Sequence, residues 1–206
     1  MRQIPDDNLK YPILVRTLVK NDKGDSVDHL VGSGVFFKQD NYFYFVTAKH
    51  VLYNEKAELK FATISLFYYG KNSELASEID LDLKALSNEN LLIAHKNADV
   101  VILRIGKDEV TPNAKEGKLI FSSEAIKMKT SNGPLVCVTD TKKFEDVMVA
   151  NDIFLLGYPS SLKNNGEIDI LMPLLRKGIV AGKNKSKKTI VIDSPVYQGN
   201  SGGPVF

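Results

Sequence analysis

A glycine-rich hexapeptide, GNSGGP at residues 199–204, constrains the fold more than any other stretch of the chain. Closely spaced glycines indicate a sharp backbone turn or a very close approach by another part of the protein. Ser201 is the one residue there that can do chemistry, and its hydroxyl becomes a useful nucleophile only beside a base that takes its proton. The motif is therefore informative only if the chain also supplies a histidine and a group that orients it.

The sequence contains both. His50 follows the apolar run at residues 42–46 in the tetrapeptide TAKH, and Asp99 opens a second apolar run in ADVVIL. A neutral imidazole can accept a hydroxyl proton near pH 7, and an adjacent carboxylate stabilises the imidazolium that forms. The other two histidines, His29 and His95, lie in polar contexts, and we expect both to be exposed.

In this order, TAKH, ADVVIL and GNSGGP resemble the motifs of the trypsin-like (chymotrypsin-fold) serine peptidases. The order of histidine, aspartate and serine is also that of the chymotrypsin arrangement. The resemblance implies that Ser201 is the nucleophile, that His50 is the general base and later acid, and that Asp99 fixes the imidazole tautomer. Asp99 is preferred to the other aspartates because it alone has the family context.

The same resemblance assigns roles around the serine. The N–H groups of Gly199 and Ser201 are implied to hold the oxyanion, where one lost donor typically costs about 3 kcal/mol of transition-state stabilisation. Pro195 lies in the specificity pocket, at the place that is acidic in enzymes that cut after arginine or lysine, which disfavours basic substrate residues. Asn200 stands where many secreted relatives have an aspartate, so we expect no activation through a new N-terminal amine.

The pattern of short strands predicts an all-β fold. With 206 residues and 43% hydrophobic composition, the chain can bury a sizeable core. Short alternating segments separated by turn residues indicate strands, expected in the first half at residues 11–19, 30–38, 42–47, 59–69, 78–84 and 99–105, and in the second half at 135–139, 152–157, 170–182 and 188–193. We read residues 1–10 as a loose lead-in, 106–134 as a linker with one helical turn at 123–127, and 141–145 as a mobile turn.

The family resemblance turns this pattern into two six-stranded antiparallel β-barrels of the chymotrypsin type. The N-terminal barrel, residues 1–110, carries His50 and Asp99, and the C-terminal barrel, residues 111–206, carries Ser201. Five residues follow Ser201, whereas the family continues with two more strands, so the second barrel is incomplete in this chain and leaves an unpaired edge. Either the natural chain continues into further C-terminal segments or domains, or a partner protein supplies the missing strands.

Charge and cysteine content narrow the function classes. The net charge of +2, from 27 basic and 25 acidic residues, does not favour nucleic acid as a partner. No stretch has the length of a membrane span or a secretory signal. The single cysteine, Cys137, cannot form an internal disulfide, which indicates the disulfide-free bacterial-type branch and a reducing compartment, most simply the cytoplasm.

The leading hypothesis is a serine endopeptidase that hydrolyses polypeptide substrates through an acyl-enzyme, with no metal and no cofactor. Two alternatives remain open. The chain could be a catalytically idle binding or sensing module built on the protease fold, or a partner-activated effector domain of a larger intracellular protein. Reactivity of Ser201 towards a fluorophosphonate probe separates the enzyme from the idle module.

Overall fold

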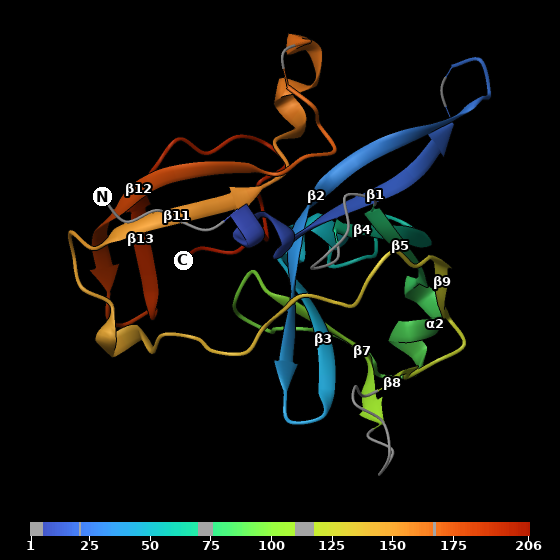
Figure 1. The fold of residues 1–206 in the computed structure, drawn as a ribbon, viewed down its shortest axis with the longest axis horizontal. Coiled ribbons are helices and arrows are strands. Elements are labelled where there is room, and N and C mark those ends of the chain that lie inside the picture. Colours follow the sequence, from blue (N-terminus) through green and yellow to red (C-terminus); the bar gives the residue numbers. More distant parts are fainter. Residues whose placement is uncertain (1–5, 21, 70–75, 110–117, 167) are drawn as a thin grey trace.

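The fold consists of two sheets that lie side by side, and all their strand pairs except β10 with β2 are antiparallel (Figure 1). The structure is a computed structural model, and it describes residues 6–20, 22–69, 76–109, 118–166 and 168–206. The larger sheet contains β1 (Pro12–Lys20), β2 (Ser26–Gln39), β3 (Tyr42–Thr47), β4 (Thr63–Tyr69), β5 (Ala76–Asp82), β6 (Leu92–Ala94), β7 (Val101–Glu109), β8 (Lys118–Phe121), β9 (Ile126–Thr130) and β10 (Cys137–Val138). The smaller sheet contains β11 (Asp152–Gly157), β12 (Leu174–Asn184) and β13 (Thr189–Asp193). The helices are short: η1 (Asp6–Lys10), α1 (Lys49–Leu52), α2 (Leu83–Asn88), η2 (Phe144–Asp146) and η3 (Ser160–Asn165).

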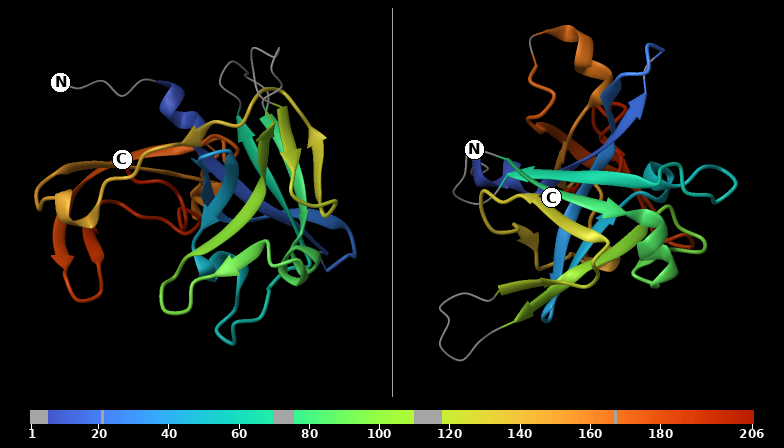
Figure 2. Two further views of the ribbon diagram at one scale, coloured as in Figure 1. Left: turned by 90° about the horizontal axis from the view of Figure 1, so that it is seen from below. Right: turned by 90° about the vertical axis from the view of Figure 1, so that its right-hand side faces the viewer.

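The larger sheet curls around the main hydrophobic core (Figure 2). Its strand order is β6-β7-β3-β2-β1-β4-β5-β9, while β8 pairs with β7 and β10 with β2. Burial alternates along β3 and β4, as expected for strands with one face on a core. Phe36 makes edge-to-face contacts with Phe45 and Tyr68, at ring-centroid distances of 6.0 Å and 5.3 Å, a geometry that aromatic quadrupoles favour.

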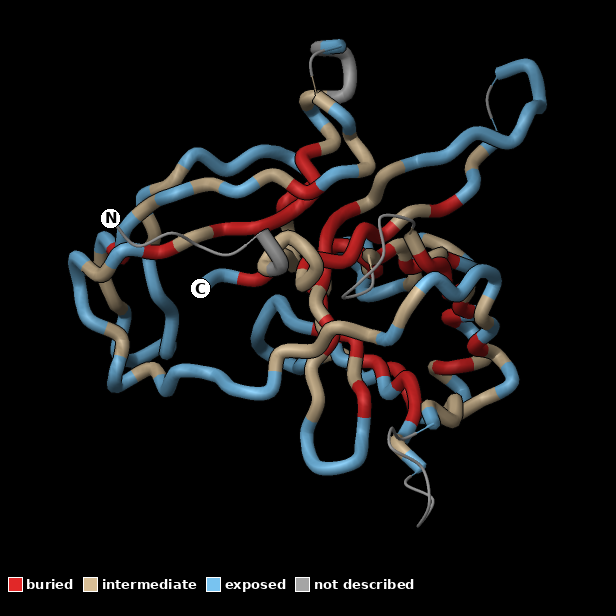
Figure 3. Tube along the Cα trace, viewed as in Figure 1, coloured by how far each residue is buried: buried red, intermediate tan, exposed pale blue. Residues whose placement is uncertain are grey.

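The smaller sheet is open and forms only part of a barrel. Its order is β11-β12-β13, and the C-terminal residues run along the other edge of β11, where the backbones of Phe154 and Phe206 exchange hydrogen bonds of 2.8 Å and 2.9 Å. Large apolar side chains remain exposed on this part of the molecule, among them Met148, Leu175, Ile179, Val191, Val196 and Phe206. Figure 3 shows the same contrast, with buried residues concentrated in the larger sheet and along β11.

The prediction of an all-β fold with two chymotrypsin-type barrels, the second incomplete, is therefore confirmed. All six strands expected in the first half are present with shifted ends, since residues 59–62 lie outside β4 and Leu83 starts α2. The strands expected at residues 152–157, 170–182 and 188–193 correspond to β11, β12 and β13.

The linker predicted at residues 106–134 is wrong where the structure describes it. Strand β7 continues to Glu109, β8 pairs with β7, and β9 pairs with β5, so these segments extend the first sheet. Residues 110–117 lie outside the described part of the chain. Strand β10, expected in the second barrel, pairs in parallel with β2 in the first sheet. The division into units near residue 110 stays a prediction.

Two segments predicted as loops contain short 3-10 helices. Residues 6–10 of the expected lead-in form the 3-10 helix η1, and residues 1–5 lie outside the described residues. The turn at residues 141–145 runs into η2, and the ammonium of Lys183 binds it by donating hydrogen bonds to the carbonyl oxygens of Phe144 and Val147. The same ammonium lies 4.4 Å from the centroid of the Phe144 ring. This turn is thus tied to the smaller sheet.

Candidate active site

The pairing of β3 with β7 brings His50 and Asp99 together. Thr47 at the end of β3 is paired with Val101 at the start of β7. His50 follows Thr47 by three residues in α1, and Asp99 precedes Val101 by two, so both side chains emerge at the same edge of the sheet. The sequence separation of 49 residues is closed by one strand pair.

His50 binds both oxygens of the Asp99 carboxylate. Its ring Nδ1 lies 2.6 Å from Oδ2 of Asp99, and its backbone N–H donates to Oδ1 at 2.8 Å. An ionised carboxylate only accepts hydrogen bonds, so the ring proton lies on Nδ1 and Nε2 is left as the acceptor. Burial by itself would raise the pKa of Asp99, but hydrogen bonds from the His50 ring and from the N–H groups of His50 and Lys49, together with electrostatic attraction from His50, lower it. Asp99 is therefore ionised at neutral pH.

The pair is open to solvent. The side chains of His50 and Asp99 are 58% and 57% exposed. The ammonium of Lys60 donates to the His50 carbonyl oxygen at 2.6 Å and braces α1 from outside.

His95 organises the loop that carries Asp99. Its Nδ1 accepts hydrogen bonds from the N–H groups of Asn97 at 3.2 Å and Ala98 at 2.8 Å, and its backbone N–H donates to the Val100 carbonyl at 2.8 Å. His95 and His29 are both exposed, as expected. His95 nevertheless has a structural task that its polar sequence context did not reveal, since it closes the turn immediately before Asp99.

The loop that contains Ser201 is packed tightly between the two sheets. Gly199 and Gly202 have φ values of +99° and +86°, a region that side-chain-bearing residues rarely adopt. A Cβ atom on Gly202 would overlap Thr47 Oγ1 and the N–H of Ala48, which directly precede the helix of His50. The glycine pattern thus marks both a turn and a close approach, and the approach is to the base of the helix α1.

Ser33, in the middle of β2, ties this loop to both sheets. Its hydroxyl donates to the Gly199 carbonyl at 2.7 Å and accepts from the Tyr158 N–H at 2.9 Å. Its backbone N–H donates to the Ser201 carbonyl at 2.9 Å, and its carbonyl accepts from the Thr47 hydroxyl at 2.6 Å. Ser33 is fully buried, so these contacts hold the backbone of residues 199–201 in one position relative to α1.

The atoms needed for chemistry at Ser201 remain available. Across the described residues, no hydrogen bond is recorded from the N–H groups of Gly199 and Ser201 or from the Ser201 hydroxyl. The structure thus brings His50 and Asp99 into contact and sets the Ser201 backbone beside α1, without a hydrogen bond between the Ser201 hydroxyl and the His50 ring. Pro195 lies in the exposed segment between β13 and this loop.

The comparison with known families agrees with this arrangement. The family model described as a trypsin-like peptidase domain matches residues 32–206, from the middle of β2 to the last residue. The chain belongs to the trypsin-like peptidase family. No match to a curated protein was found.

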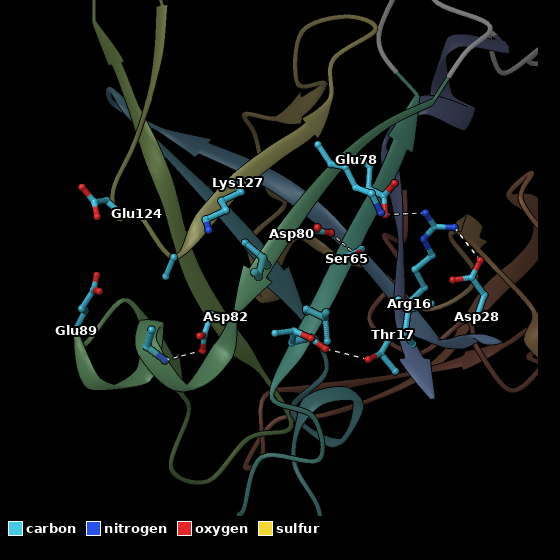
Figure 4. Close-up of a pocket in the computed structure, with 17 residues that line it drawn as sticks. Arg16, Thr17, Asp28, Ser65, Glu78, Asp80, Asp82, Glu89, Glu124 and Lys127 are labelled. Carbon is cyan, nitrogen blue, oxygen red and sulfur yellow. Dashed lines mark hydrogen bonds and ion pairs between the residues drawn. The ribbon is translucent and has the colours of Figure 1, made fainter. Parts of the chain in front are cut away.

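This trypsin-like peptidase domain also has a cavity that none of the predicted triad residues lines. It has a volume of about 550 Å³ and lies over β1, β4, β5 and β9 (Figure 4). Arg16 joins Asp28 and Glu78 across it, at 3.2 Å and 2.6 Å, and Lys129 adds a second cation to Glu78 at 3.3 Å. Burial would raise the pKa of Glu78, but these ion pairs outweigh burial and lower it.

The described part of this peptidase domain shows neither a membrane-spanning helix nor a metal-binding cluster. None of its helices has the length and apolar composition that crossing a lipid bilayer requires. Within the same residues, no three His, Cys, Asp or Glu side chains are grouped so that they could hold a metal ion. Asp80 and Asp82, which lie on one face of β5, instead accept hydrogen bonds from the Ser65 hydroxyl and the Ala85 N–H.

Proposed function

We propose that this protein is a serine endopeptidase that cleaves polypeptide substrates through a Ser201–His50–Asp99 triad. The observation that carries the proposal is the double hydrogen bond between His50 and Asp99, made directly beside the glycine loop of Ser201. Membership in the trypsin-like peptidase family supports the same reaction class.

The first half of the reaction forms an acyl-enzyme. Nε2 of His50 takes the Ser201 proton while Oγ attacks the substrate carbonyl carbon, and the C=O electron pair moves to oxygen. The N–H groups of Gly199 and Ser201 donate to this oxyanion. When the intermediate collapses, the C–N bond breaks, and the leaving amine takes the proton from His50.

In the second half of the reaction, water takes the place of Ser201 as the nucleophile and hydrolyses the acyl-enzyme. It attacks the acyl carbon while giving a proton to His50, and collapse returns the proton to Ser201 Oγ as the new carboxyl group leaves. Asp99, ionised at neutral pH, stabilises the imidazolium at both stages and fixes the tautomer with Nε2 free. Catalytic hydrogen bonds often tighten only when substrate binds, which reconciles this role with a serine hydroxyl that makes no hydrogen bond to the ring in the free protein.

A covering element is the second part of the proposal. A further protein segment should cover the smaller sheet, because apolar side chains are exposed there and the His50–Asp99 pair is also half-exposed. Further C-terminal domains or a partner protein would supply this segment. Neither a nucleic acid nor a membrane is proposed as a partner, and no metal or cofactor is assigned a role. With Cys137 as the single cysteine, we place this activity in a reducing compartment such as the cytoplasm.

A fluorophosphonate probe tests the proposal. We expect wild type to be labelled and Ser201→Ala and His50→Ala to stay unlabelled, with Ser131→Ala, a change at an exposed serine, as the matched control. If wild type is not labelled when prepared with its natural full-length sequence, the idle binding module replaces the enzyme. If labelling needs a second protein, the partner-activated alternative is correct.

A further inference from the structure

Arg176 is a cation on the buried face of the smaller sheet. It lies directly opposite Leu155 in the pairing of β11 with β12, and residues paired in this way share a face. Leu155 is 5% exposed, and Val180, on the same face of β12, is 1% exposed. The guanidinium therefore projects towards the apolar side of the sheet.

No acidic group neutralises this cation in the described part of the chain. No ion pair or hydrogen bond is recorded for its guanidinium there, and its Nε is buried without a hydrogen-bond partner. The recorded contact is with an aromatic ring, since Cζ lies 4.9 Å from the ring centroid of Tyr197. Stacking of this kind contacts the face of the guanidinium and leaves its edge N–H groups free for an anion.

Tyr197 connects Arg176 to the loop that contains Ser201. Its carbonyl accepts a hydrogen bond of 3.1 Å from the N–H of Asn200, the residue before Ser201. The intervening segment carries no acidic side chain, because Pro195 and Val196 precede Tyr197 and Gln198 follows it. The segment 195–198, which the structure describes throughout, thus places a positive charge and no negative one of its own beside the Ser201 loop.

Arg176 is half-buried and its Nε is fully buried, and a charge that loses part of its hydration is normally compensated by a partner. Arginine is also the residue best suited to bind a carboxylate with two parallel hydrogen bonds. We infer that Arg176 forms a carboxylate-binding subsite that selects substrates with glutamate or aspartate immediately before the cleaved bond. This inference rests on the proposed peptidase function and names its substrate class.

Peptide cleavage tests the subsite. The kcat/KM of wild type is measured for four fluorogenic peptides that differ only in the residue before the scissile bond, which is Glu, Gln, Leu or Lys. We expect kcat/KM for Glu to exceed that for Gln by about 10-fold or more, the effect of one charge-assisted contact. Arg176→Gln should abolish this preference, lowering kcat/KM for Glu far more than that for Leu. Lys177→Gln, a change on the opposite face of β12, should keep the preference.

The failures are distinguishable. If wild type cleaves peptides but treats Glu and Gln alike, or if Arg176→Gln slows all substrates equally, the subsite is refuted and the peptidase stands. If nothing is cleaved and the probe labels nothing, the peptidase itself is refuted. A binding measurement then tests the subsite without catalysis: calorimetry on Ser201→Ala should show about tenfold tighter binding of a product peptide ending in Glu than of one ending in Gln. Equal binding overturns the inference.

Discussion

Replacing Ser33 by alanine removes one buried hydroxyl that serves two backbone groups. The Gly199 carbonyl loses its donor and the Tyr158 N–H loses its acceptor. Both partners lie in buried residues, and Ser33 itself is fully buried, so water cannot easily replace the hydroxyl. A buried polar group left without a partner costs about 1–3 kcal/mol. With two groups left unpaired, we expect Ser33→Ala to lower the free energy of unfolding by about 2–6 kcal/mol.

This loss is large compared with the total stability of a typical domain, about 5–15 kcal/mol. Urea unfolding followed by circular dichroism measures it, with Ser131→Ala, the same change at an exposed serine, as control. The control should lie within about 0.5 kcal/mol of wild type. Because the lost contacts hold the loop that contains Ser201, the rate of fluorophosphonate labelling should also fall. A stability loss under about 0.5 kcal/mol with unchanged labelling would show that Ser33 does not anchor this loop.

Three more predictions follow from named contacts. Burial alone would raise the pKa of Glu78, but the ion pairs with Arg16 and Lys129 hold it below its ordinary value of 4.5. These ion pairs therefore stabilise the fold above that pH, and the free energy of unfolding falls as acid protonates the carboxylate. Urea titrations below pH 4.5 should show a weaker pH dependence for Glu78→Gln than for wild type. In peptide cleavage assays, His95→Leu should lower kcat more than it raises KM. His95→Asn should restore kcat, because its side-chain oxygen can accept hydrogen bonds from the same two N–H groups. Equal losses of kcat in the two variants would refute a positioning role for His95. Gly202→Ala should yield little folded protein by circular dichroism, because its Cβ would overlap Thr47 and Ala48.

Sequence patterns predicted the strands that alternate cleanly and the residues that lie in contiguous motifs. His50 and Asp99 were recognisable because each directly borders an apolar strand, and the pairing of those strands brings them together. Strands β8 and β9 were missed because they are short, with 4 and 5 residues, and gain strand structure from pairing with β7 and β5, a long-range contact that the local sequence does not show.

The supporting residues of the site were harder to predict for a related reason. The hydroxyl of Ser33 binds partners 125 and 166 residues away, so nothing near it in the sequence reveals the contacts. Its one local signal is its place between Gly32 and Gly34, because closely spaced glycines indicate close packing but do not identify the packing partner. Arg176 lies in a strand whose buried face becomes apparent only from the register with β11.

The most direct test of the account is a crystal structure of the protein carrying a fluorophosphonate adduct. We predict that the adduct lies on Ser201 Oγ and that His50 Nε2 lies within about 3 Å of this oxygen. The phosphonyl oxygen should lie about 2.7–3.1 Å from the N–H groups of Gly199 and Ser201. An adduct on another residue, or an imidazole that still binds Asp99 but lies far from the modified serine, would contradict the triad.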